Sequence, residues 1–221
     1  MANPKLHISK EILWEESVFP VDFEDVDNSK IIEHYHELKK EDPAGVVNSN
    51  HGGYQVMLAG NRNEELDKLM CGLAQAATEI YNKGYAHKEK LVISNCWFNG
   101  NEYGDCNVLH NHPGAVLSGV YYLTDGKPEH GEITLIRPNR NEILSFKNTK
   151  EEIPNDPEYG LSYTRLASFP AVASRALLFA PWMEHYVTPN KTQDLRIVIG
   201  LNFSIEGRED ECPFATLGYR P

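Results

Sequence analysis

The stretch LHNHPGAVLSGVYYL, residues 109–123, sets two histidines in front of a Pro-Gly turn and a run of strand-forming residues. On an extended segment, residues i and i+2 point to the same side, so His110 and His112 can converge on one point. Asn111 between them then points away. Two imidazoles on one side of a segment can chelate a metal ion, and this pair predicts a metal site at the start of the strand.

A third metal ligand has to come from elsewhere in the chain, and His185 is the best candidate. It lies in RALLFAPWMEHYVTPN, residues 175–190, just past the end of another predicted strand. Three neutral imidazoles suit Fe, Zn, Cu or Ni and leave positions open for a substrate or oxygen. Asp105, five residues before His110, is a weaker alternative, because it reaches the metal only if the segment loops back.

The predicted strand LRIVIGLNF, residues 195–203, contains a charged residue, although a charged side chain is unfavourable on a buried strand. Its odd-numbered positions are all apolar, whereas Arg196, Gly200 and Asn202 share the other face. An arginine inside a β core is costly without a partner, so Arg196 should bind something. One answer is a bidentate grip on a small carboxylate ligand, with Gly200 leaving room beside it. The other is a neighbouring Asp or Glu of the chain.

Short strands rich in Val, Ile, Leu, Tyr and Phe dominate the chain from about residue 90. They are expected at residues 90–98, 115–123, 131–138, 162–169, 175–181 and 195–203. Residues 124–131 look like a hairpin loop between two of them. The first ninety residues instead carry helical signals.

Two helices are predicted in that first part of the chain. Residues 27–29 can cap one that ends before Asp42, and Asn63 can cap a second that runs to about Gly84. The second helix has an apolar stripe, so it should lie against a sheet. Helices first and strands afterwards indicate an α+β domain with a sandwich or jelly-roll core.

Composition narrows the classes of function. A length of 221 residues, 41% of them hydrophobic and 24% charged, suits one globular domain. The net charge of -11 disfavours broad contact with nucleic acid. No apolar run is long enough to span a bilayer and no secretory signal is visible, so we expect a cytoplasmic protein without a membrane segment. The four cysteines form no CxxC pair, which argues against a zinc ribbon.

Taken together, these motifs resemble the Fe(II)- and 2-oxoglutarate-dependent dioxygenases, and more narrowly their prolyl-hydroxylase-like branch. The string HNHPG-x(3)-SGVYYL is the most specific part, and the resemblance covers roughly residues 90–205. It implies a double-stranded β-helix, which is a cupin-like jelly roll of two sheets supported by N-terminal helices. We therefore expect a single domain over residues 1–221, with a helical support region at 1–89, a jelly-roll core at 90–205 and a C-terminal tail at 206–221.

The resemblance also implies roles for particular residues. The family's iron site is usually His-x-Asp/Glu followed by a distal His, and these positions match His110, His112 and His185. Arg196 matches the basic residue that binds the far carboxylate of 2-oxoglutarate. Tyr122 matches a tyrosine that hydrogen-bonds the same carboxylate. The implied cofactor is Fe(II), and the implied cosubstrate is 2-oxoglutarate.

Histidine at position 112 departs from the family's carboxylate and gives a site of three imidazoles. In a second register, His112 is the first ligand and Gly114 takes the carboxylate position, which resembles the iron halogenases. Trp97, Trp182 and Tyr121 are candidate walls of a cavity, although ordinary core packing is the commoner role of such aromatics.

The implied activity is hydroxylation of an unidentified substrate with release of succinate and CO2. Two alternatives stand beside it: a three-His cupin-type metal dioxygenase that does not use 2-oxoglutarate, and a non-catalytic jelly-roll binding module. The substrate is either a small molecule or a protein side chain. The sequence fixes neither the substrate nor the oligomeric state, for which a homodimer is one option.

Overall fold

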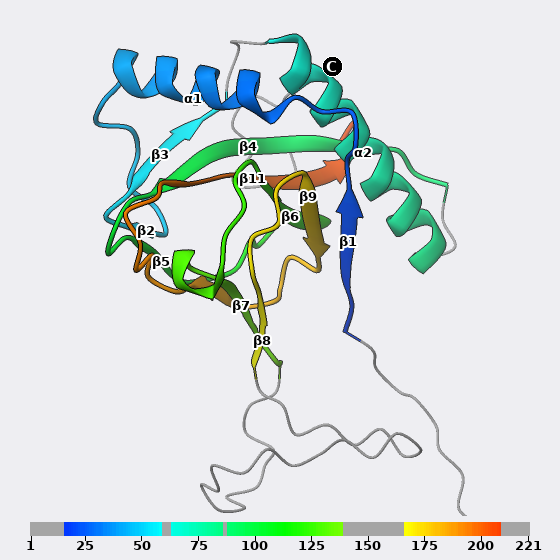
Figure 1. The fold of residues 1–221 in the computed structure, drawn as a ribbon. Coiled ribbons are helices and arrows are strands. Elements are labelled where there is room, and N and C mark those ends of the chain that lie inside the picture. The colour runs from blue at the N-terminus through cyan, green and yellow to red at the C-terminus, as the bar shows by residue number, and fades with distance from the viewer. Residues whose placement is uncertain (1–15, 59–62, 86–87, 139–165, 209–221) are drawn as a thin grey trace, which may run out of the picture.

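Two antiparallel sheets form the body of the computed structural model, which describes residues 16–58, 63–85, 88–138 and 166–208. The larger sheet has six strands, in the spatial order β1 (Val18–Asp22), β9 (Arg175–Phe179), β6 (Leu117–Tyr122), β11 (Arg196–Ile205), β4 (Leu91–Asn101) and β3 (Tyr54–Met57). The smaller sheet has five, in the order β2 (Asn50–His51), β5 (Cys106–His110), β10 (His185–Val187), β7 (Ile133–Ile136) and β8 (Leu166–Phe169). The expected α+β jelly roll is therefore confirmed (Figure 1).

The predicted strands all have a counterpart, although only 166–169 of the segment 162–169 is described. The structure adds five strands that the sequence analysis missed, namely β1, β2, β3, β5 and β10. They are two to five residues long, too short for an alternating pattern to stand out. Three of them come from residues 1–89, so that region supplies strands as well as helical support.

The predicted hairpin at residues 124–131 is wrong. The strand before it, β6, belongs to the larger sheet, and the strand after it, β7, belongs to the smaller one. The segment therefore crosses between the sheets, and it contains a short 3-10 helix, η1 (Pro128–His130). Local turn residues look the same in both cases, because the partner of each strand is chosen by distant parts of the chain.

Both predicted helices are present with their predicted caps. Asp27 caps α1 (Asn28–Glu41), where its Oδ1 accepts a hydrogen bond from Ser29 N at 3.1 Å. Asn63 Oδ1 accepts from Leu66 N at 2.8 Å at the start of α2 (Glu64–Tyr85). The two helices cover the outer face of the larger sheet (Figure 1). Among the described residues, no helix combines the length and the apolar composition that a membrane crossing requires.

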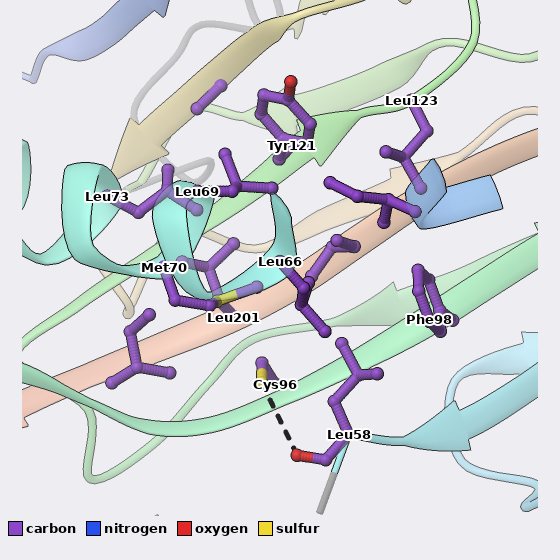
Figure 2. Packing of buried hydrophobic residues seen from close by; sticks show 14 of the residues in the cluster. Leu58, Leu66, Leu69, Met70, Leu73, Cys96, Phe98, Tyr121, Leu123 and Leu201 are labelled. Carbon is purple, nitrogen blue, oxygen red and sulfur yellow. Dashed lines mark hydrogen bonds between the residues drawn. The ribbon is translucent and has the colours of Figure 1, made fainter. Parts of the chain in front are cut away.

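The apolar stripe of α2 packs on the larger sheet, as expected. Figure 2 shows its side chains meeting those of β4, β6 and β11 in one cluster. The helix contributes Leu66, Leu69, Met70 and Leu73, which are at most 1% exposed. A second cluster lies between the sheets and includes Tyr122 of β6 and Val198 of β11.

Because it is covered on both faces, β11 is buried almost throughout. Its odd-numbered residues Ile197, Ile199, Leu201 and Phe203 belong to the helix-side cluster. Its even-numbered positions therefore face the smaller sheet, and Arg196 is among them. The same alternation on β6 sends Tyr121 to the helices and Tyr122 to the space between the sheets.

Candidate metal centre

His110 and His112, which are close together in the chain, meet the distant His185 where β5 ends and β10 begins. His110 ends β5 and His185 begins β10, and the antiparallel pairing of these strands sets the two residues directly opposite each other. Their ring centroids are 4.2 Å apart. The His112 ring lies 5.1 Å from each of the other two. The candidate ligand atoms of all three residues lie within 4.8 Å of one another, so they surround a single point.

Backbone carbonyl groups orient two of the three rings. His110 Nδ1 lies 2.7 Å from Val108 O, and His185 Nδ1 lies 2.9 Å from Met183 O. A carbonyl oxygen only accepts hydrogen bonds, so Nδ1 carries the hydrogen and the lone pair of Nε2 is left for a metal. The His112 ring makes no such bond to a described residue. Its backbone N–H instead donates to Pro181 O at 2.9 Å, which ties this turn to the segment before His185.

The three imidazoles are neutral at physiological pH. Burial lowers the pKa of His112 to about 3, with smaller contributions from His185 and His110. Burial also lowers the pKa of His185 to about 4, and it lowers the pKa of His110. The neutral imidazole is the form that binds metal, so the cluster is prepared for an ion without first releasing protons.

These lowered pKa values predict that the metal-free protein loses stability in mild acid. Below pH about 6.5 the unfolded histidines take up protons that the folded ones refuse, so the free energy of unfolding falls as the pH drops from 6.5 towards 4. For His112 and His185 we expect a loss of roughly 1–2 kcal/mol each between pH 7 and pH 5. Urea unfolding of the metal-free protein at these two pH values measures it.

The matched variant for this measurement is H112Q, which keeps a polar side chain but cannot titrate. Its loss of stability between the two pH values should be smaller than that of the parent. An equal loss in both proteins contradicts the lowered pKa of His112.

Arg196 is buried between the sheets, and no carboxylate of the described residues pairs with it. It is 2% exposed, and its Nε, Nη1 and Nη2 atoms have no hydrogen-bond partner among the described residues. Burial lowers the pKa of the guanidinium, but an arginine stays charged in proteins. A charged group in this position is costly until an acceptor reaches it. The sequence allowed two partners for Arg196, a small carboxylate ligand or an Asp or Glu of the chain. The described residues do not supply the Asp or Glu.

Tyr122 accompanies Arg196 on the same inner face. Its ring centroid lies 5.6 Å from Arg196 Cζ, and its hydroxyl is also buried without a hydrogen-bond partner among the described residues. Burial raises the pKa of Tyr122 to about 12, so the hydroxyl keeps its proton and can donate it in a hydrogen bond. The Arg196 guanidinium and the Tyr122 hydroxyl act on each other's pKa, and neither has an acceptor at full hydrogen-bond geometry among the described residues.

Gly200 does not play the part that the sequence suggested. It was expected to leave room for a ligand beside Arg196, but the Trp97 indole fills that room from the opposite position on β4. Trp97 in turn comes close to the metal site, since its ring lies 5.7 Å from the His112 ring. The spacing of Trp97 and Gly200 in the sequence gave no sign of this contact.

The other candidates are not members of the histidine cluster. Tyr121 faces the helices, where its hydroxyl donates to Asn28 Oδ1 at 2.7 Å, so it is not a wall of the space between the sheets. Trp182 is 52% exposed. Asp105 holds a turn, with its Oδ2 accepting from Glu102 N at 2.8 Å. Gly114 is exposed and has a φ of +88° in the turn after His112.

Solved structures with the same fold include an alpha-ketoglutarate-dependent carbocyclase, a prolyl-4-hydroxylase and a protein with nickel and 2-oxoglutarate bound. The non-heme alpha-ketoglutarate-dependent carbocyclase SnoK from nogalamycin biosynthesis is 13% identical with a TM-score of 0.62, covering 86% of this chain and 79% of its own. A Pseudomonas putida prolyl-4-hydroxylase is 14% identical with a TM-score of 0.60, covering 87% and 94%. HygX from Streptomyces hygroscopicus, solved with nickel and 2-oxoglutarate, is 11% identical with a TM-score of 0.58, covering 87% and 84%. At such low identity the likeness shows a shared double-stranded β-helix.

A family model gives the more specific match. No curated protein matches the chain. Residues 95–202, about half of the chain, match the family described as "Putative 2OG-Fe(II) oxygenase". This range holds the three clustered histidines together with Arg196 and Tyr122. Through this domain, the chain belongs to the 2OG-Fe(II) oxygenases, a family of enzymes.

Proposed function

We propose that this protein is an Fe(II)- and 2-oxoglutarate-dependent hydroxylase. In this proposal His110, His112 and His185 bind Fe(II), and Arg196 and Tyr122 bind the far carboxylate of 2-oxoglutarate. The observation that carries the proposal is the buried guanidinium of Arg196, which has no acceptor among the described residues. A dicarboxylate that also binds the metal would satisfy it.

The side chains at the site suit both Fe(II) and 2-oxoglutarate. Three neutral imidazoles are good ligands for a borderline divalent ion, and their pKa values keep them neutral at pH 7. Arg196 offers a planar fork of N–H donors, which matches a carboxylate in two parallel hydrogen bonds. The Tyr122 hydroxyl adds a third donor, held protonated by its raised pKa.

The chain's own residues then hold and orient what binds. When bound, the iron and 2-oxoglutarate supply the oxygen chemistry, in which the cosubstrate is converted to succinate and CO2 and the substrate is hydroxylated. Val108 O and Met183 O fix the His110 and His185 rings so that Nε2 faces the metal. Arg196 and Tyr122 hold the far end of the cosubstrate in a buried place, which strengthens their hydrogen bonds and keeps water out.

The alternatives have less support. A three-His dioxygenase that does not use 2-oxoglutarate leaves the buried Arg196 without an acceptor among the described residues. The halogenase-like register gives His110 no role, although His110 is paired with His185, and it relies on Gly114, which is exposed beyond the turn. A non-catalytic module gives no reason for three neutral histidines, one buried and two partly buried, around one point.

The domain limits and the class of substrate are also proposals. We propose one domain over the whole chain; residues 1–15 and 209–221, which include most of the predicted tail, lie outside the described part. The substrate is a small molecule or a protein side chain. The homodimer and the cytoplasmic location stay predictions from the sequence.

An anaerobic titration tests the proposal. Fe(II) and then 2-oxoglutarate are added to the metal-free protein, and the weak visible charge-transfer band of the iron–2-oxoglutarate pair is followed. We expect the band to appear and to saturate at one equivalent of each. Formation of succinate after admission of O2, without any added substrate, measures turnover. A protein that binds Fe(II) but develops no band contradicts the use of 2-oxoglutarate.

Substitutions at His112 decide whether this residue is a ligand. H112D restores the family's usual carboxylate, so we expect it to bind Fe(II) within about tenfold of the parent. H112A should bind at least ~100-fold more weakly, since a lost ligand costs more than a lost outer partner. Isothermal titration calorimetry under nitrogen measures both.

H112N is the matched control for H112D, because it has the same size without the charge. It should bind as weakly as H112A. If H112A instead binds Fe(II) as tightly as the parent, His112 is not a ligand and the site consists of His110 and His185 alone.

A further inference from the structure

The His112 ring lacks the kind of support that its two neighbours have. His110 and His185 are each held by a carbonyl at Nδ1, whereas no hydrogen bond from a described residue reaches the His112 ring. His112 also lies outside any strand, in the turn that follows β5. A ligand on a turn with a free ring can rotate away from the metal, and metal sites depend on groups that prevent this.

Trp97 is the side chain in position to hold this ring. Its indole and the His112 imidazole form a tilted aromatic pair, with centroids 5.7 Å apart and planes inclined by 40°. This separation lies inside the range in which aromatic rings attract each other. Trp97 belongs to β4, a strand of 11 residues that is paired on both sides, with β11 and β3, so its backbone is fixed.

The indole reaches this place because the residue opposite it is a glycine. Gly200 on β11 is the direct partner of Trp97 in the β4–β11 pairing. A Cβ atom at position 200 would lie within 2.6 Å of three indole atoms, Cε2, Cζ2 and Nε1. Any larger residue would therefore push the indole off β11. The Trp97 indole therefore packs directly over Gly200, on the face of the larger sheet that points toward the smaller sheet.

We propose that Trp97, seated on Gly200, is the positioning residue for His112. The indole limits the rotation of the imidazole and keeps it directed at the metal, in place of the hydrogen bond that His110 and His185 have. This inference rests on the proposed metal site. It also explains how the chain accommodates a histidine at a position where the family usually has a carboxylate, because an imidazole has a ring face that the indole can contact.

Co(II) binding tests the proposal without need of a substrate. Co(II) takes histidine ligands, and its visible absorption reports how many are bound. We expect W97L to weaken Co(II) binding about tenfold and to change the absorption, as loss of an outer partner of a ligand does. W97F, which keeps an aromatic ring, should recover most of the affinity. G200A should weaken binding in the same direction as W97L.

The matched control for G200A is G119A on β6. Gly119 faces the helix side of the same sheet, and a Cβ atom there would lie within about 3.0 Å of Leu177 O and also meet Leu178. G119A therefore strains the sheet away from the metal, and it should lower thermal stability without changing Co(II) affinity. If W97L does not fold, the comparison of G200A with G119A decides.

A double-mutant cycle separates positioning from general damage to the fold. Trp97 acts through His112 in this proposal, so W97L should have no further effect on Co(II) affinity in the H112A or H112D background. The same tenfold loss in those backgrounds, or W97L affinity within twofold of the parent, overturns the inference and leaves the proposed function intact. A parent protein that binds no Co(II) and no Fe(II) overturns both.

Discussion

Replacing Arg196 by methionine should abolish 2-oxoglutarate binding and, at the same time, stabilise the ligand-free fold. Arg196 is the side chain that we expect to hold the far carboxylate, and losing one partner of a buried charged pair costs about 2–5 kcal/mol. That corresponds to an affinity lower by at least about 30-fold, at roughly 1.4 kcal/mol per tenfold. Calorimetric titration of 2-oxoglutarate into protein loaded with Co(II) measures this loss.

The gain in stability follows from the same burial. In the ligand-free protein the guanidinium has no acceptor among the described residues, so its desolvation is not offset. Methionine fills a similar volume without a charge, and replacements of buried charged groups of this kind are neutral or stabilise by about 1–4 kcal/mol. Urea unfolding of the ligand-free parent and of R196M measures the difference.

R175M is the matched control, because Arg175 is an arginine on the same sheet that already has a partner. Its Nε and Nη2 donate to the two carboxylate oxygens of Asp22 at 2.7 and 2.9 Å, on the surface. R175M should leave 2-oxoglutarate affinity unchanged and should not stabilise the protein. If R196M is less stable than the parent and still binds 2-oxoglutarate, Arg196 has a structural role, and the dioxygenase that does not use 2-oxoglutarate becomes the better reading.

Replacing His185 by alanine should remove metal binding. His185 is the most buried of the three clustered histidines, at 4% exposed, and its strand β10 pairs directly with the strand that carries His110. Its loss leaves two ligands on one short segment, so we expect Fe(II) and Co(II) affinity to fall at least ~100-fold. Anaerobic calorimetry and the metal content after gel filtration measure this fall.

H51A controls for the loss of any histidine in this region. His51 lies on β2, the other neighbour of β5, and it is exposed and outside the cluster. Its removal should leave metal affinity within twofold of the parent. H185A protein that retains full metal content contradicts the proposed site, provided that its circular dichroism shows the native fold.

Much of the site followed from local patterns in the sequence. The spacing of His110 and His112 put both rings on one side, and the alternation in residues 195–203 put Arg196 on a polar face. Asn63 and Asp27 could be identified as helix caps because capping depends only on neighbours in the chain. The place of His185 just past a predicted strand made it the best third ligand, and the family resemblance then added Tyr122, which no local pattern could connect to the other residues.

Other features could not be predicted because they depend on short strands. β5 and β10 have five and three residues, and only their pairing sets His110 opposite His185. The hairpin predicted at residues 124–131 was wrong for another reason. A turn does not indicate which sheet the next strand joins. The assignment of Tyr121 as a cavity wall failed for a related reason, because the face to which it points is set by where the helices pack.

The sequence by itself determined an α+β class with a sandwich or jelly-roll core, the covering helices and the types of residue that could bind a metal and a carboxylate, because each of these depends on periodicity, capping or a motif within a continuous segment. The choice of the jelly roll came from the family resemblance. Only the tertiary structure decided that three histidines surround one point, that Arg196 has no protein carboxylate among the described residues, and that Trp97 fills the space above Gly200. Apart from the pair His110 and His112, these are contacts between residues that lie far apart in the chain. Their geometry is set by strand register and by packing between the sheets, which no local pattern of residues encodes.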